Sequence, residues 1–245
     1  MLDRESLARK AASFKREAQR AFEEAVLALI ELVFDKGDPS VRFLWENYPR
    51  LDAEANALLR DLSDDLAQKA KALAEEAVRD AFDSEDFGEI WDEETLVERF
   101  DMAGSHLKEL LEIWIAVAAL NGIRESELRV LVTRYLNNPF ASPLWKGLPK
   151  DILAWGRGYD KNILEQIAVI GQNAIIGGAR LAEWMAARRR GATYYIRRRG
   201  SGYHCPECDS LCGYPIPIDT PFDYVHSRCM CWPEYHYEPM PDVQV

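Results

Sequence analysis

Residues 3–34 read DRESLARKAASFKREAQRAFEEAVLALIELVF, and this stretch sets the expected fold class. Apolar and small side chains recur in alternating steps of four and three, which is typical of a helix that packs along a seam against another helix. The seam consists of Leu7, Ala11, Phe14, Ala18, Ala21, Ala25, Ala28 and Leu32. A helix of this length, ended by the turn-forming residues 35–40, predicts a mainly α protein.

A second long helix is predicted after a short apolar stretch. Residues 41–48 carry the anchors Phe43, Leu44 and Trp45, and we expect Pro49 to end this piece because proline removes a helical hydrogen bond. Residues 52–82 then form the second helix. Its stripe consists of Leu59, Leu62, Leu66, Leu73 and Ala77. Two long helices with a short connection predict a hairpin inside an intramolecular bundle, with an oligomerisation stalk as the alternative.

Three more helices and one strand are expected further along the chain. The helices cover residues 105–120, 126–136 and 160–190, and the strand covers residues 193–196. Residues 83–101 hold nine acidic side chains and predict a solvated loop and a helix start rather than a metal site. Residues 139–159 predict an irregular connection. The expected domains are a helical hairpin region over 1–100, a helical body over 101–190 and a small tail with short strands over 191–245.

The chain has 245 residues, of which 48% are hydrophobic and 29% charged, and its net charge is -11. This composition excludes wholesale disorder and a uniformly basic surface for gripping nucleic acid. The charge is uneven, because residues 1–187 carry the whole net charge and residues 188–245 are neutral. The start of the chain does not resemble a signal peptide, and the longest apolar run has eight residues. We therefore expect a soluble protein of a reducing cytosol, without membrane contact.

All five cysteines lie within residues 205–231, which predicts a metal site rather than a disulfide scaffold. Cys205 and Cys208 form a C-x2-C element, and residues 226–231 form an H-x2-C-x-C element. Zinc prefers four thiolate and imidazole ligands in a tetrahedron, and a tail this small needs such support to fold. The predicted ligands of a structural zinc are Cys205, Cys208, His226 and Cys229, with Cys231 as the alternative to Cys229. Cys212 is expected to be a core residue beneath them.

Nothing in the sequence specifies an enzyme. A catalytic zinc would need an open coordination position and a nearby carboxylate base, and the chain has no H-E-x-x-H motif. It also has no glycine-rich phosphate loop. A nucleophilic pair of Cys229 and His226 conflicts with their place in the metal pattern. We therefore expect a binding protein with no catalytic residues and no small-molecule substrate.

Six arginines and two tyrosines precede the first cysteine, and we call them the basic collar. They are Arg188, Arg189, Arg190, Tyr194, Tyr195, Arg197, Arg198 and Arg199. Arginine binds phosphate in a fork geometry and tyrosine stacks on bases, so the basic collar is a candidate contact with DNA or with a partner protein. The alternative is that these arginines pair with carboxylates of the protein itself, such as those of residues 83–101.

The tail resembles the C-terminal part of the phage Mu F-like family of minor capsid and head morphogenesis proteins. The resemblance rests on CPECDSLCG at residues 205–213, VHSRCMC at residues 225–231, the preceding helix over residues 164–187 and RYLNNP at residues 134–139. It covers residues 124–235. Ser227 and Met230 stand where the family usually has proline and arginine.

The resemblance implies a structural component of the virion, located in the capsid interior and made in the cytoplasm of a bacterial host. It implies a role beside the portal in head assembly, DNA packaging or genome delivery. The implied partners are the portal protein and the capsid or scaffold proteins, and DNA is left as a further contact. Some relatives carry an appended domain, and none is expected here after Val245. The alternative function is a zinc-ribbon protein that binds nucleic acid through the basic collar.

Overall fold

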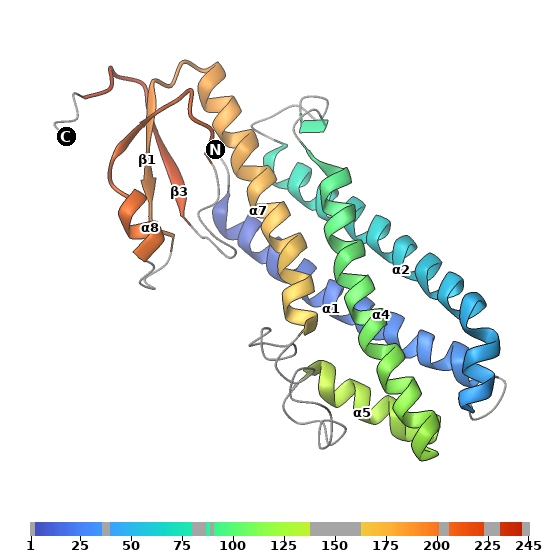
Figure 1. Cartoon of the computed structure of the whole chain (residues 1–245). Helices are drawn as coiled ribbons and strands as arrows, with labels where there is room; N and C mark the ends of the chain where they lie inside the picture. The colour runs from blue at the N-terminus through green and yellow to red at the C-terminus, as the bar shows by residue number, and fades with distance from the viewer. Residues whose placement is uncertain are drawn as a thin grey trace. The chain divides into compact units, whose positions relative to one another are not determined.

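The computed structural model describes residues 3–35, 40–79, 87–88, 91–137, 163–200, 206–222 and 231–241. Over these residues the protein is mainly helical, as predicted, with a small sheet towards the C-terminus (Figure 1). The helices are α1 (Arg4–Phe34), α2 (Val41–Val78), α4 (Glu93–Asn121), α5 (Glu125–Asn137), α7 (Ile163–Arg189) and α8 (Pro206–Leu211). The strands are β1 (Tyr194–Arg198), β2 (Pro215–Pro217) and β3 (Trp232–His236).

The predicted seam of α1 is buried in the first half of the helix and shifts in the second half. Phe14 and Ala18 are fully buried, whereas Ala28 is exposed and the neighbouring Phe22 and Ile30 are buried instead. A straight helix has 3.6 residues per turn, so a stripe with a period of 3.5 drifts by about 20° every seven residues. In the second half of the helix this drift turns Ala28 outward and brings Phe22 and Ile30 into the core, while Ala25 stays buried.

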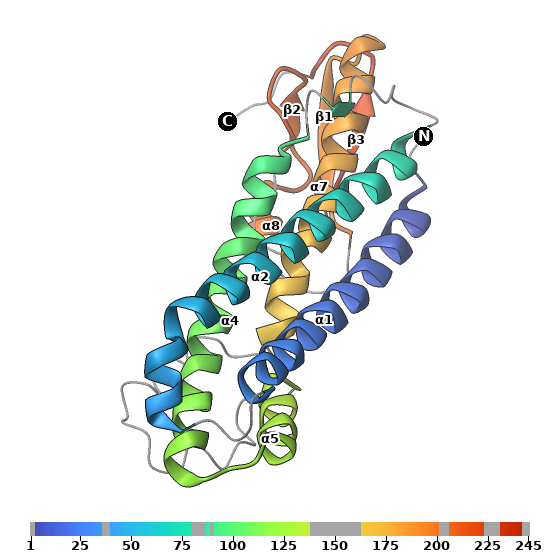
Figure 2. The ribbon, with the colours of Figure 1, turned by 90° about the vertical axis from the view of Figure 1, so that its right-hand side faces the viewer.

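The prediction that Pro49 ends a short helix is wrong. α2 runs from Val41 to Val78 with Pro49 inside it. Proline lacks an N–H group and removes one hydrogen bond, which bends a helix without necessarily ending it. Figure 2 shows the first turns of α2 at an angle to the rest of the helix. Ser40 caps the start of the helix, because its hydroxyl oxygen accepts a hydrogen bond from the Phe43 N–H at 3.1 Å.

α4 begins twelve residues before the predicted start at Ser105, because part of the acidic stretch is helical. Leu96 and Phe100 are buried four residues apart, and Glu93 pairs with Lys71 at 3.1 Å. Carboxylates in the first turn also stabilise a helix, because they interact favourably with the positive end of its dipole. The helix start expected within residues 83–101 thus lies at Glu93, and the separate start predicted at Ser105 is wrong. At the other end Gly122 has φ 63° and the Ile123 N–H donates to the Ala118 carbonyl at 2.9 Å, as in a glycine C-cap.

Packing divides the chain into two units that do not follow the three predicted regions. The helical unit comprises residues 15–68 and 94–170, and the tail unit comprises residues 1–14, 69–93 and 171–245. The core of the helical unit contains Phe22 and Phe100, whose ring centroids lie 6.3 Å apart. A Cβ atom on Gly104 would touch Leu59 at 3.5 Å, so the backbone of α4 approaches α2 closely there.

In the tail unit, a three-stranded antiparallel sheet of order β2-β1-β3 lies beside the end of α7 (Figures 1 and 2). Gly191, at φ 87°, ends α7, and the Ala192 N–H donates to the Ala187 carbonyl at 3.0 Å. The chain then enters β1, in which Tyr195 pairs with residues of both neighbouring strands. The Trp184 indole N–H donates to the Ile218 carbonyl at 2.9 Å and thereby ties α7 to the turn after β2.

Candidate functional site

A small hydrophobic core in the tail unit collects three of the five cysteines. Trp184 and Ala187 from α7, Tyr195 from β1, and Ile218 and Phe222 after β2 belong to it. Cys208 and Cys231 are buried in the same core, and Cys212 packs against it. The sequence patterns at residues 205–213 and 225–231 thus contribute side chains to one cluster, although they are separated along the chain.

The sulfur atoms of Cys212 and Cys231 lie 4.0 Å apart. A disulfide requires about 2.0 Å, and no disulfide links Cys208, Cys212 and Cys231. Zinc–sulfur bonds of about 2.3 Å place two thiolates of one tetrahedron about 3.8 Å apart, so the observed separation fits two ligands of one zinc ion. Burial and the neighbouring Cys231 raise the pKa of the Cys212 thiol to about 11, so the thiol itself is neutral at pH 7.

The predicted zinc ligands are only partly described. Cys208 and Cys231 lie in the core, whereas Cys205, His226 and Cys229 lie outside the described residues. Within the described ranges, no three His, Cys, Asp or Glu side chains are grouped so as to hold a metal ion. The complete ligand set therefore stays a prediction. Cys212 packs as the expected core residue, but its closeness to Cys231 was not indicated by spacing.

Three arginines of the basic collar pair with carboxylates of the tail unit. Arg188 Nη2 lies 3.1 Å from Asp219 Oδ1, and Arg199 Nη1 lies 2.7 Å from Asp209 Oδ1. Arg198 pairs with Glu234, and this guanidinium lowers the pKa of the Glu234 carboxyl. The acidic partners of these three arginines thus come from the tail itself.

Three further collar residues point into the tail unit. Arg197 is 5% exposed, and its guanidinium carbon lies 4.2 Å from the centroid of the Phe222 ring. Tyr195 is 1% exposed and its hydroxyl donates to the Pro221 carbonyl at 3.3 Å. The ring of Tyr194 is buried and stacks on His236 with centroids 4.6 Å apart. Because both tyrosine rings are packed inside the protein, they are not placed to stack on bases.

We expect DNA binding through the basic collar to depend only weakly on salt. Only Arg188, Arg189 and Arg190 are exposed among the collar arginines, so the log–log slope of affinity against salt should be no steeper than about -3. If all six arginines contacted phosphates, the slope would be about -5. Fluorescence anisotropy with a labelled duplex between about 50 and 200 mM salt measures it. The steeper slope would show that the collar ion pairs open on DNA.

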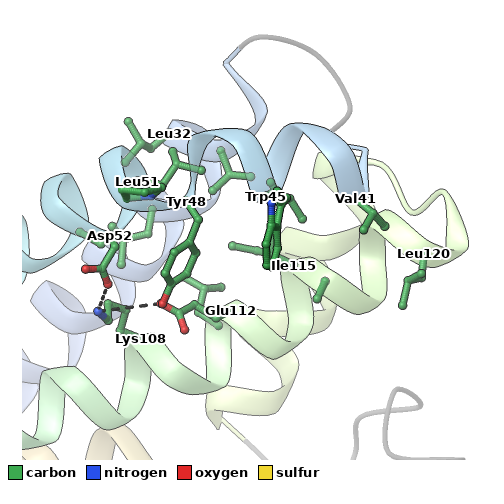
Figure 3. Close-up of a pocket in the computed structure, with 17 residues that line it drawn as sticks. Leu32, Val41, Trp45, Tyr48, Leu51, Asp52, Lys108, Glu112, Ile115 and Leu120 are labelled. Atoms are coloured by element: carbon green, nitrogen blue, oxygen red, sulfur yellow. Dashed lines mark hydrogen bonds and ion pairs between the residues drawn. The ribbon is translucent and has the colours of Figure 1, made fainter.

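An apolar groove of about 680 Å³ lies in the helical unit and was not predicted. The end of α1, the first turns of α2 and the second half of α4 form its walls (Figure 3). Three of its side chains are unusually exposed for their size: Trp45 at 85%, Leu120 at 71% and Val41 at 55%. The expectation that Trp45 anchors a core is therefore wrong. Apolar side chains gathered in this way mark interaction surfaces.

One end of the groove is polar. The Lys108 ammonium pairs with Asp52, donates to the Asn56 side-chain oxygen at 2.8 Å and lies 3.9 Å from Glu112 Oε1. The Tyr48 hydroxyl donates to the Glu112 carboxylate. Figure 3 shows both side chains at this end of the groove, with dashed lines that mark the interactions of Lys108. Burial raises the pKa of Glu112 above its ordinary value, although Lys108 opposes this effect.

Replacing Glu112 by glutamine should stabilise the protein at pH 7 and not at pH 4. Because the folded-state pKa of Glu112 is raised, its contribution is most favourable below the unfolded pKa of about 4.3 and is lost as the pH rises through the folded value. The side chain is 36% exposed, so solvent screens the effect and we expect a gain of about 1–2 °C in Tm. Melting curves at both pH values measure it. Glu98→Gln, on the same helix and outside the groove, is the control, because Glu98 is exposed and the Glu112 carboxyl stays in place.

The cysteine core, the basic collar and the groove are the features on which a function must rest. No helix within the described ranges is long and apolar enough to span a bilayer. No family model, no curated protein and no solved structure matches the chain.

Proposed function

We propose that this protein is a non-catalytic structural component of a phage head that acts beside the portal in head assembly, DNA packaging or genome delivery. The observation that supports this most is the shared core of α7, β1 and the segments around Cys208 and Cys231. The family that the tail resembles has a last helix, a short strand and two cysteine-containing elements in this order. If this chain folds like that family, these four segments should pack together, and residues from all four share one core.

A structural zinc ion is part of the proposal. The predicted ligands are Cys205, Cys208, His226 and Cys229, with Cys231 as the alternative to Cys229. Of these, Cys208 and Cys231 lie in the shared core, and the spacing of Cys212 and Cys231 fits the sulfur chemistry of zinc. When bound, the ion would cross-link segments that have few apolar contacts of their own, since binding energy at such sites is folding energy. The short strands β1, β2 and β3 otherwise depend on one small core.

The alternative of a nucleic-acid-binding zinc ribbon has less support. Arg188, Arg198 and Arg199 have carboxylate partners within the tail unit, and the rings of Tyr194 and Tyr195 are buried. DNA affinity comes largely from lysine and arginine side chains that reach phosphates, and only Arg188, Arg189 and Arg190 of the collar are exposed. We therefore propose portal and capsid or scaffold proteins as the partners.

Co-expression with the portal and major capsid proteins encoded beside the gene tests the proposal. Heads are purified on a density gradient, and mass spectrometry measures the ratio of this chain to the portal protein. We expect the chain in intact heads at a constant ratio to the portal. Heads that form in equal number and composition without the chain, or a gene without portal and capsid genes beside it, would contradict the proposal.

A further inference from the structure

We propose that the apolar groove of the helical unit is the docking site for an amphipathic helix of a partner protein, which carries a lysine or arginine at one end of its apolar face. This inference goes beyond the proposed function, because the groove contains no cysteine and no collar residue. Its failure would therefore leave the proposed function unaffected.

The apolar walls provide the driving force for docking. Trp45 leaves 85% of its surface in water, and Leu120 and Val41 leave more than half of theirs. Covering such side chains contributes about 25 cal/mol for each Å² of apolar surface removed from water. Tryptophan is also the residue type most enriched among the few that dominate binding energies. A side chain in this position is a strong candidate for the energetic centre of an interface.

The shape of the groove favours a helix as the occupant. On α2 the lining residues Val41, Leu44, Tyr48, Leu51 and Ala55 recur in steps of three and four, so they form one face of that helix. They extend over about 21 Å, which is the length of a helix of about 14 residues. The lining residues of α4 form a second such face, from Lys108 to Leu120. Two parallel rows of side chains are the surface into which an amphipathic helix packs.

The polar end of the groove favours a cation on that helix. Its charged groups are Asp52, Glu112 and Lys108, so the negative charges outnumber the positive one. Asp52 is already held by Lys108 and by the Asn56 side-chain amide at 3.1 Å. Glu112 lies farther from Lys108, at 3.9 Å, and after its hydrogen bond from Tyr48 it still has acceptor sites for a partner. The net charge of -11 on the whole chain also attracts positively charged partners.

The exposure of Trp45 also argues for a macromolecule over a small amphiphile. A pocket for a small ligand encloses most of the ligand surface and of its own aromatic side chains. Here Trp45 and Tyr48, at 85% and 50% exposed, lie at the rim of the groove. A partner that covers the rim buries both rings, whereas a ligand confined to the groove floor leaves them in water.

Two labelled peptides of 14 residues test the inference on the full chain. Both have leucines at helical spacing on one face and glutamines on the other, and they differ only by a lysine or a glutamate at one end. We expect the lysine peptide to bind about fivefold more tightly than the glutamate peptide. Trp45→Ala should weaken binding of both by about 30-fold, and Glu112→Gln should remove the difference between them. Fluorescence anisotropy gives the affinities.

Val130→Ala and Glu98→Gln are the matched controls, since both residues are exposed and lie in the helical unit outside the groove. They should leave both affinities unchanged. The inference fails if the two peptides bind equally, or if Trp45→Ala has no effect. It also fails if analytical ultracentrifugation shows a dimer that Trp45→Ala dissolves, because a second copy is then the occupant. Melting curves of the variants show that each one is folded.

Discussion

Replacing Gly171 by alanine should destabilise the protein by about 1–3 kcal/mol, although alanine favours helices by about 1 kcal/mol over glycine. A Cβ atom on Gly171 would lie 2.0 Å from Cε1 and 2.6 Å from Cζ of Phe14. The Phe14 ring is fully buried, so it has no solvent-filled space into which to turn. The contact joins α1 to α7 within the tail unit, so the clash separates two helices that the unit depends on.

Urea denaturation of four proteins measures this effect: the natural chain, Gly171→Ala, Phe14→Leu and the double variant. Leucine is shorter than phenylalanine and makes room for the new methyl group, so the double variant should be more stable than the sum of the single effects predicts. Gly88→Ala is the control, because a Cβ atom there meets nothing within 4 Å. A Gly171→Ala variant as stable as the natural chain would contradict the packing of α1 on α7.

Gly171 shows what a sequence pattern leaves out. Its helix was predicted from local apolar patterning, and local signals also predicted α5 and the start of β1 to within a few residues. The close approach of Phe14 depends on a residue that is more than 150 positions away in the chain. Periodicity contains no information on such a pairing, so the role of Gly171 was not predictable.

The groove was missed for a different reason. The apolar residues from Val41 to Ala55 have helical spacing, and the signal was therefore present in the sequence. Taking Pro49 as a helix end divided this face into two pieces, and neither piece alone indicated a surface. The exposure of Trp45 adds to the difficulty, since a tryptophan among apolar residues is more often part of a core. Sequence alone does not separate a core face from an unpartnered one.

The candidate zinc site lies between these two cases. Clustering of the cysteines predicted that the two elements meet, and Cys208 and Cys231 do share one core. Spacing did not indicate that the sulfur of Cys212 lies 4.0 Å from that of Cys231. The burial of Tyr194 and Tyr195 depends on the pairing of β1 with β2 and β3, which are distant in the chain. Composition alone therefore suggested two tyrosines for stacking on bases, although both rings are buried.

Removal of zinc should unfold the tail unit and leave much of the helical unit intact. Structural zinc sites bind with about 10–16 kcal/mol, which is comparable to the whole stability of a typical domain, about 5–15 kcal/mol. We therefore expect native mass spectrometry of freshly purified, reduced protein to show one zinc ion per chain. A chelator should make the chain after residue 190 sensitive to protease, while circular dichroism retains most of the helical signal.

Cysteine variants then identify the ligands. Cys208→Ser should release zinc and reproduce the effect of the chelator, because the loss of one thiolate weakens the site and leaves a polar hydroxyl in the core. Cys212→Ser and Cys229→Ser separate the two ways of completing the site. If Cys212 is a ligand, as its distance to Cys231 suits, its variant loses zinc. If Cys212 only fills the core, its variant retains zinc, and either Cys229→Ser or Cys231→Ser loses it. Protein that contains no zinc in the reduced, unmodified state would refute the metal site altogether.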